Sequence, residues 1–338
     1  MSAIVSRSIH LASRPEGAAS LSDFDLREAP LPAMPAGGVT LRTLYLSLDP
    51  YMRGRMDARR SYAAAVEVGG VMTGETVAEV IASDNPNFEV GDMVTARTGW
   101  TTHAVSDGSG LTKVDPALAP PSAWLGVLGM PGFTAYSGLI AIGKPKPGET
   151  VVVAAATGPV GSLVGQLAHS IGARAVAIAG GPEKCAFATE TFGFDAAIDH
   201  RADSFASDLA AACPDGVDVY FENVGGAVWQ AVLPLLNNFA RVPVCGLIAQ
   251  YDGGSTGSGT LAATMREILS RRLLLRGFIN SDFAAEHYGD FKRTVAEGLE
   301  SGAIRYREDI SEGLESAPQA FLRMLRGENF GKTLVKLA

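Results

Sequence analysis

A glycine-containing turn near the middle of the chain is the clearest candidate in the sequence for a ligand-binding site. Thr150–Ala173 reads TVVVAAATGPVGSLVGQLAHSIGA: an apolar strand-like run, a turn, and a segment with apolar residues at helical spacing. Gly158 permits a tight turn, Gly161 lets the backbone approach a pyrophosphate, and Gly165 lets the helix pack closely on the strand. A helix N-terminus also offers unpaired N–H donors and a partial positive charge. The pattern predicts a dinucleotide site, and an ordinary tight turn is the alternative.

The end of the next strand indicates which dinucleotide to expect. Sites for NAD commonly place an Asp or Glu there, against the adenosine ribose. Here the strand ends at Gly180-Gly181, and the following helix begins Pro182-Glu183-Lys184. Lys184 can meet a 2′-phosphate, and a charge-assisted contact contributes roughly 1.5–3 kcal/mol. We therefore predict NADPH, although Lys184 as a solvated lysine and Glu183 as a ribose ligand are alternatives.

Metal and serine-hydrolase chemistry have weak support in the sequence. The three cysteines are dispersed and the five histidines show no H-x-x-x-H spacing, so no metal site is expected. Gly253–Gly257 matches the G-x-S-x-G pattern of serine hydrolases. However, Ser255 does not directly follow a strand, as a nucleophile elbow requires. The chemistry is therefore expected to come from an organic cofactor.

The elements that must position these residues follow from hydrophobic patterning. Between about 145 and 280, short apolar runs alternate with helix-period segments, which is typical of parallel strands with crossover helices. The expected strands are 150–156, 174–179, 196–199, 217–221, 240–246 and 273–279. Residues 39 to about 115 show short β-like runs without clear helices, and two helical segments and a strand at 332–337 follow residue 283. The change of pattern predicts a domain boundary near residue 125.

Length and charge exclude several classes of protein. A chain of 338 residues suggests two domains. With 28 Lys and Arg against 36 Asp and Glu, it has no excess positive charge for a nucleic-acid backbone. Glycine and proline interrupt both long uncharged stretches, 116–143 and 150–173, so no membrane span is expected. Residues 1–15 lack an export signal and the cysteines form no disulfide framework, so a cytoplasmic location is expected.

The chain as a whole resembles the medium-chain dehydrogenase/reductase superfamily, in its zinc-free branch of prostaglandin reductases, leukotriene dehydrogenases and alkenal double-bond reductases. The segments that carry the resemblance are LYLSLDPYMRGRM (44–56), ATGPVGSLVGQLA (156–168), EKCAFATETFGFD (183–195), YFENVGG (220–226), RVPVCGLIAQYD (241–252) and ENFGKTLVKL (328–337). The resemblance implies a Rossmann domain at 125–296 and a β-rich GroES-like catalytic domain at 1–124, to which 297–338 returns. It also implies a homodimer, with the strand at Leu273–Ile279 as the seam. Zinc is expected to be absent, because Thr73 stands where zinc-dependent relatives have a histidine.

The resemblance also implies the residues of the site. The expected cofactor-binding residues are Gly158, Val160, Gly161, Lys184, His200, Asn223, Cys245, Tyr251, Phe278, Asn280 and Asn329. His200 replaces a tyrosine beside the cofactor phosphate, and Asn280 replaces a usually apolar residue. Tyr251 and Tyr51 are the expected catalytic residues, with Tyr251 near the substrate carbonyl and Tyr51, beside Met52, in the active-site segment of the first domain. Packing and turn formation are the alternatives for these side chains.

The activity implied by the resemblance is NADPH-dependent reduction of the C=C bond in α,β-unsaturated ketones or aldehydes. Hydride would go to the β-carbon and a proton to the α-carbon. An NADPH quinone oxidoreductase of the same superfamily is the main alternative. A protein that binds NADPH without turnover is another.

Overall fold

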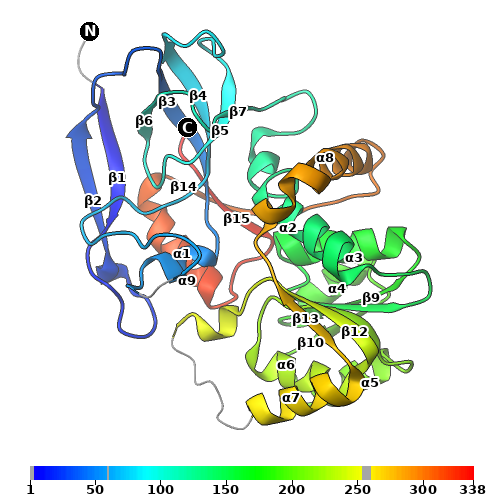
Figure 1. Cartoon of the computed structure of the whole chain (residues 1–338). Coiled ribbons are helices and arrows are strands. Elements are labelled where there is room, and N and C mark those ends of the chain that lie inside the picture. Colours follow the sequence, from blue (N-terminus) through cyan, green and yellow to red (C-terminus); the bar gives the residue numbers. More distant parts are fainter. Residues whose placement is uncertain (1–3, 59–60, 253–259) are drawn as a thin grey trace. The chain divides into compact units, whose positions relative to one another are not determined.

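The computed structural model describes residues 4–58, 61–252 and 260–338, which belong to two compact units (Figure 1). Unit 1 consists of Met1–Gly126 and Glu308–Ala338, and unit 2 consists of Val127–Arg307. No helix in these described ranges is long and apolar enough to cross a membrane. The match to the G-x-S-x-G pattern at Gly253–Gly257, which the sequence did not favour as a hydrolase site, lies outside the described residues.

Unit 2 is built on a six-stranded sheet whose paired strands all run parallel, in the order β10-β9-β8-β11-β12-β13. Its strands are β8 (Thr150–Ala154), β9 (Arg174–Ala179), β10 (Ala196–Asp199), β11 (Val217–Phe221), β12 (Leu236–Val244) and β13 (Leu274–Gly277). Its helices are α2 (Met130–Ser137), α3 (Pro159–Ser170), α4 (Pro182–Glu190), α5 (Phe205–Ala212), α6 (Gly226–Val232), α7 (Thr260–Arg271) and α8 (Ala284–Glu300). Helices lie on both faces of this sheet in Figure 1, as the doubly wound prediction requires.

The first strand of unit 2, β8, and the helix that follows it, α3, form because their apolar residues are buried together. All five residues of β8 are buried, and α3 begins with Pro159 at a position where a missing N–H is harmless. The close packing at Gly165 involves a different neighbour from the strand that the sequence predicts. A Cβ on Gly165 would lie 2.0 Å from Cζ of Phe194, so this glycine admits the ring of Phe194 rather than the adjoining strand. The close packing at Gly165 is therefore between α3 and the segment before β10.

Strand β12 differs from its predicted range of 240–246. It begins at Leu236, because the pairing with β11 is irregular: Val217 is opposite Leu236, while Val219 is opposite Arg241. It ends at Val244, because the amides of the next two residues donate to the backbone oxygen of Glu222 instead of continuing the ladder. The strand thus leads directly into a turn at the carboxyl edge of the sheet.

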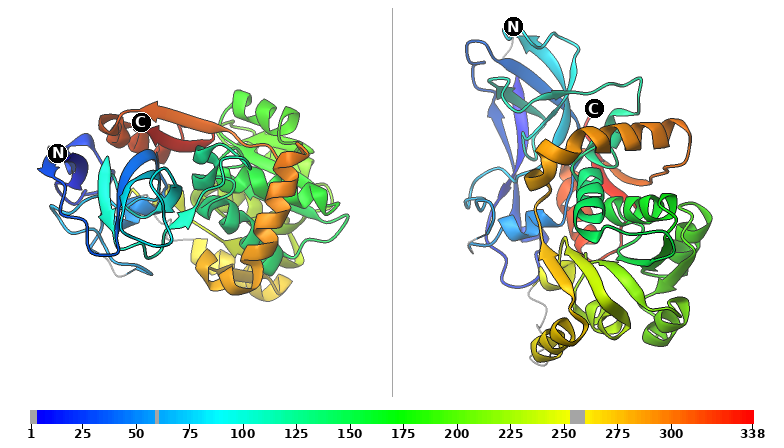
Figure 2. Two further views of the ribbon diagram at one scale, coloured as in Figure 1. Left: turned by 90° about the horizontal axis from the view of Figure 1, so that it is seen from above. Right: turned by 45° about the vertical axis from the view of Figure 1, so that its right-hand side comes forward.

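Unit 1 is a mixed β structure whose strands come from both ends of the chain. Its elements are β1 (Val5–Leu11), β2 (Phe24–Pro30), β3 (Val39–Ser47), α1 (Tyr51–Arg55), β4 (Thr76–Ser83), β5 (Met93–Ala96), β6 (His103–Ser106), β7 (Thr112–Lys113), β14 (Glu308–Glu312), α9 (Ala317–Leu325) and β15 (Lys332–Lys336). The last strand, β15, pairs antiparallel with β3 and parallel with β14. Figure 2 shows this red C-terminal segment beside the blue and cyan strands of the unit.

Two sequence expectations, one on helices in the first unit and one on where the chain returns to it, need correction. The region predicted to lack helices contains α1, a short helix that begins directly after Pro50. The return of the chain was expected at 297, but residues 297–300 still belong to α8. This helix stays in unit 2 because Phe291 and Val295 are buried, and Phe291 packs on the rings of Phe133 and Tyr136 in α2.

Candidate active site

The carboxyl ends of the parallel strands bring most of the predicted site residues of unit 2 to one edge. Strand order reverses between β8 and β11, since β9 lies on the far side of β8 and β12 on the far side of β11. Ligands of doubly wound sheets bind at such a switch point. Asn223 spans it: its side-chain Nδ2 donates to the backbone oxygen of Ala154, at 2.8 Å.

In the glycine turn between β8 and α3, the backbone at Gly161 lies close to the backbone at Ala155. A Cβ on Gly161 would lie 2.5 Å from the oxygen of Ala155, whereas one on Gly158 would have its nearest neighbour at 3.3 Å. Ala155 itself has φ +52°, a left-handed conformation that alanine rarely adopts. Gly158 is the N-cap of α3, and Val160 lies in its first turn. This turn presents helix N-terminal amides at the carboxyl edge, which fits the pyrophosphate of a dinucleotide.

The residues predicted for the phosphorylated ribose follow the next two strands. Lys184 is half-buried in the first turn of α4, and His200 directly follows β10. The amide of His200 donates to the oxygen of Ala179, at 3.0 Å. Partial removal of the ring from solvent, together with Arg201 and Lys184, lowers the pKa of His200, while Asp199 acts in the opposite direction. Basic groups therefore gather at the end of β9 where an NAD site has an acid.

A buried carboxylate that the sequence analysis missed holds the loop after β11. Glu222 Oε1 accepts hydrogen bonds from the Tyr220 hydroxyl at 2.9 Å and from the amides of Val224 and Gly225 at 2.7 and 2.8 Å. Burial raises the pKa of Glu222 against the opposing effect of these amide bonds. The signal in the sequence is an acid directly after the apolar strand 217–221. The Glu222 carboxylate thus fixes the backbone that directly follows Asn223.

Cys245 and Tyr251 follow β12 on the same edge. The amide of Cys245 donates to the oxygen of Glu222 at 2.9 Å, and burial, with the charge of Glu222, raises the pKa of the Cys245 thiol to about 12. The thiol therefore stays protonated and is no nucleophile at neutral pH. The Tyr251 hydroxyl accepts from the amide of Leu247 at 3.4 Å and lies against Gly246, where a Cβ would be 3.2 Å from it.

Phe278 and Asn280 follow β13 and contact the body of unit 2. The ring of Phe278 packs edge-on against Phe221, and a Cβ on Gly138 would lie 2.6 Å from its Cζ. Asn280 Nδ2 donates to the backbone oxygen of Met130 at 3.2 Å and to Thr134 Oγ1 at 3.1 Å. The side-chain nitrogen of Asn280 therefore binds the start of α2, at Met130 and Thr134.

The predicted residues of unit 1 come from two segments: Tyr51 and Met52 from α1, and Asn329 from the loop before β15. Tyr51 begins α1, and burial together with the carboxylates of Asp49 and Glu75 raises its pKa. The Tyr51 phenol therefore stays protonated at neutral pH. Met52 is fully buried in the apolar core, which favours the packing interpretation for its side chain. Asn329 Nδ2 donates to the oxygen of Gly331, at 2.9 Å, and so shapes its own loop.

A buried ion pair, also missed from the sequence, joins these two segments of unit 1. Lys332 Nζ donates to Asp49 Oδ1 and to the backbone oxygen of Leu48, both at 2.7 Å. Ser47 donates to the other oxygen of the same carboxylate. Both charged side chains are at most 5% exposed. The pair fixes the turn before Tyr51 to the strand that follows Asn329.

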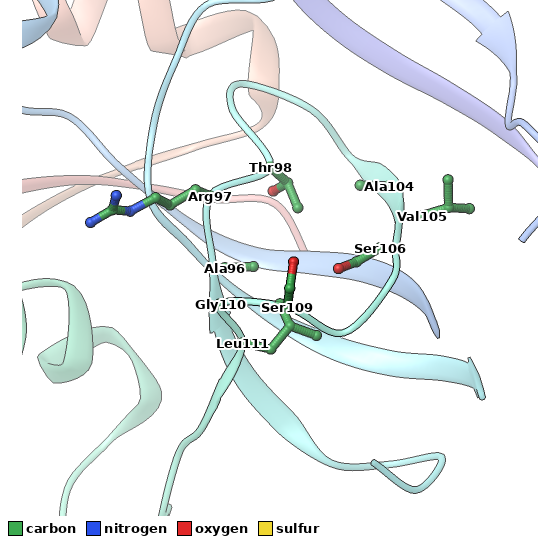
Figure 3. Close-up of a pocket in the computed structure, with 9 residues that line it drawn as sticks. All are labelled: Ala96, Arg97, Thr98, Ala104, Val105, Ser106, Ser109, Gly110 and Leu111. Atoms are coloured by element: carbon green, nitrogen blue, oxygen red, sulfur yellow. The ribbon is translucent and has the colours of Figure 1, made fainter. Parts of the chain in front are cut away.

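A pocket of about 380 Å³ in unit 1 does not involve the predicted site. Figure 3 shows it bordered by backbone and by the side chains of Ser106 and Ser109, with Arg97 directed away. Arg97 instead approaches Glu75, with Nε at 3.3 Å from Oε1. The pocket contains none of the predicted site residues, so it offers no basis for the chemistry considered above.

Comparison with known proteins decides the family. A model described as the N-terminal domain of oxidoreductase matches residues 7–114, and one described as zinc-binding dehydrogenase matches residues 159–297. The chain is 50% identical over 330 residues to the NADPH-dependent curcumin reductase of Escherichia coli (strain K12), covering 97% of this chain and 96% of the relative. The chain belongs to the medium-chain dehydrogenase/reductase superfamily.

Other relatives place the chain in one branch of the medium-chain dehydrogenases/reductases. Prostaglandin reductase 1 of Rattus norvegicus is 42% identical, covering 95% of this chain and 96% of the relative. The NADP(+)-dependent 2-alkenal reductase of Nicotiana tabacum is 38% identical, covering 94% and 93%. The crystal structure of CurA from Vibrio vulnificus with NADPH matches with a TM-score of 0.94 and 50% identity over 98% of this chain and 99% of that chain. The predicted family and fold class are confirmed.

The name of one matching model raises the question of zinc in this reductase. In the described part of the chain, no three His, Cys, Asp or Glu side chains are grouped so that they could hold a metal ion. Gly74, beside Thr73, lies against apolar groups: a Cβ there would be 2.9 Å from Leu46 Cδ1 and 3.1 Å from Trp100 Cδ1. Thr73 stands at the position where the resemblance places a zinc-binding histidine. The described residues offer no other group of zinc ligands in its place.

Proposed function

We propose that this reductase uses NADPH to reduce the C=C bond of α,β-unsaturated ketones or aldehydes, independently of zinc. The observation that carries the proposal is the 50% sequence identity, over 97% of this chain, with an NADPH-dependent curcumin reductase. The prostaglandin and 2-alkenal reductases among its relatives support the same substrate class. The glycine turn, the basic end of β9 and the hydrogen-bonded loop after β11 fit the cofactor.

NADPH, when bound, supplies the hydride that goes to the β-carbon of the substrate. The α3 N-terminus would hold the pyrophosphate, with Gly158, Val160 and Gly161 forming the turn. Lys184 and His200 would meet the 2′-phosphate. The other proposed cofactor contacts are Asn223, Cys245, Tyr251, Phe278, Asn280 and Asn329. Glu222 would act indirectly, by holding the loop of Asn223 in place.

The substrate needs a hydrogen-bond donor for the negative charge that develops on its carbonyl oxygen. Tyr251 is our proposed donor, and Tyr51 is the second proposed catalytic residue. A tyrosine with a raised pKa, such as Tyr51, can donate a hydrogen bond at neutral pH but cannot act as a base. Removing one donor of this kind lowers the rate on the order of 10²–10³-fold.

Steady-state assays that follow nicotinamide absorbance with enones, enals and quinones test the proposal. We expect turnover of enones or enals, with products that gain two hydrogens across the C=C bond by mass spectrometry. Tyr251→Phe should lower kcat on the order of 10²-fold, while Tyr288→Phe, a change on the partly exposed side of α8, should not. Turnover restricted to quinones would instead support the quinone oxidoreductase alternative.

We also infer that the protein is a homodimer in the cytoplasm. Strand β13 is the last strand of its sheet, and Leu274 on it is 49% exposed. Three exposed apolar residues, Leu261, Met265 and Leu269, recur at a spacing of four along α7. A second copy of the chain would cover such a surface and extend the sheet. The three cysteines are free thiols, which suits a reducing compartment.

A further inference from the structure

The carboxyl end of β9 is bordered by nitrogen atoms from another strand end. A Cβ placed on Gly180 would lie 3.0 Å from His200 Nε2, 3.1 Å from Arg201 Nε and 3.2 Å from Arg201 Cζ. In NAD sites this strand end commonly carries an acid that binds the ribose. Here it carries no side chain, and an imidazole and a guanidinium lie within contact distance of the space beside it.

The pairing of β9 with β10 brings Arg201 to this place. The two strands run parallel with Asp199 opposite Ala179, so the residues after each strand meet at one edge. Asp199 Oδ1 accepts hydrogen bonds from the amides of Gly181 at 2.8 Å and Arg201 at 2.9 Å. One carboxylate therefore joins the turn after β9 to the turn after β10, and it fixes the backbone from which Arg201 projects.

The charged groups around the end of β9 also influence the His200 ring. Partial desolvation, Arg201 and Lys184 all lower the pKa of His200, so both cations act on one ring. Desolvation raises the pKa of Asp199, but the amide bonds from Arg201 and Gly181, together with the charges of His200 and Arg201, outweigh it and the net shift is downward. Asp199 is therefore ionised at neutral pH, and its hydrogen bonds to the two turns persist there. Lys184, on α4, and Arg201, in the turn after β10, therefore both lie within electrostatic range of the His200 ring.

We propose that Arg201 binds the 2′-phosphate of NADPH together with Lys184 and helps this reductase to distinguish NADPH from NADH. The proposal rests on the proposed use of NADPH. A guanidinium presents two parallel N–H donors that match phosphate oxygens, whereas a lysine ammonium acts as a point charge. The missing side chain at Gly180 leaves the guanidinium room beside the strand end.

Binding of two adenosine nucleotides to the full-length protein, measured by isothermal titration calorimetry, tests this role without turnover. The probes are adenosine 2′,5′-bisphosphate, which carries the 2′-phosphate, and adenosine 5′-monophosphate, which lacks it. Arg201→Ala should weaken the bisphosphate at least about tenfold while changing the monophosphate by less than about twofold. Arg174→Ala is the matched control: this arginine begins β9 at the opposite end and donates to the backbone oxygen of Ala212.

A second variant tests the geometry rather than the charge. Gly180→Ala should also weaken the bisphosphate selectively, because its Cβ would displace the ends of His200 and Arg201. Equal weakening of both nucleotides by Arg201→Ala, or no change in either, would overturn the role of Arg201. Wild-type protein that does not prefer the bisphosphate would instead contradict the proposed use of NADPH, so the two failures are distinguishable.

Discussion

At the scale of single residues, the proposed cofactor preference depends on cations at the end of β9. Lys184→Ala should weaken NADPH by at least about tenfold and NADH by much less, because only NADPH carries the 2′-phosphate. Fluorescence titration of both nucleotides measures this. Lys146→Ala, an exposed lysine of the same unit, is the control and should change neither affinity. Equal losses for NADPH and NADH would remove the proposed phosphate role of Lys184.

Glu222 gives a second prediction at this scale, on pH dependence. Because burial raises its pKa above 4.5, the folded protein binds this proton more tightly than the unfolded chain. The stability that the group contributes is therefore full below the unfolded pKa and is lost as pH rises through the folded pKa. Glu222→Gln removes this loss and keeps an oxygen to accept from Tyr220.

Urea unfolding at pH 5 and pH 8 compares the free energies of unfolding of the two proteins. The wild type should lose stability relative to Glu222→Gln as the pH rises. Glu183→Gln, at an exposed side chain in the first turn of α4, is the control and should follow the wild type. A constant difference between wild type and Glu222→Gln across this range would mean that Glu222 does not titrate as the structure indicates.

At the scale of elements, the joint between β8 and α3 depends on the absence of a Cβ at Gly161. Gly161→Ala places a methyl group 2.5 Å from the oxygen of Ala155, in a turn whose backbone is already left-handed. We expect a loss of about 1–3 kcal/mol in the free energy of unfolding and weaker NADPH binding. Gly289→Ala is the matched control, since nothing lies within 4 Å of its Cβ in α8, and it should gain about 0.5–1 kcal/mol. Urea unfolding measures both, and unchanged stability in Gly161→Ala would contradict the close approach.

At the scale of the whole molecule, the exposed face of α7 and the edge strand β13 predict self-association. Light scattering after size-exclusion chromatography should give twice the monomer mass for the wild type. Leu269→Glu should shift the protein toward monomer, because Leu269 is 80% exposed and its charge would be buried between copies. Val90→Glu, at a residue 66% exposed in unit 1, should leave the mass unchanged. A monomeric wild type would contradict the proposed dimer.

The parts of the fold that follow local patterns are predictable from the sequence. Strands β9, β10 and β11 have the bounds that apolar periodicity predicts, and the turn at Gly158 lies between a buried strand and a helix as expected. Strand and helix periods reflect which residues face a core, so a short window of sequence contains the information. The irregular start of β12 was not predictable, because it depends on how that strand pairs with β11.

The sequence by itself predicted a dinucleotide-binding unit, a phosphorylated cofactor on the basis of Lys184, and a second, β-rich unit. Only the tertiary structure decided which distant residues lie together: Arg201 beside Gly180, Phe194 beside Gly165, and Lys332 beside Asp49. These encounters depend on strand order and register, which no local pattern records. Spacing along the chain reports backbone conformation and burial, whereas the convergence of charges at a site requires the folded sheet.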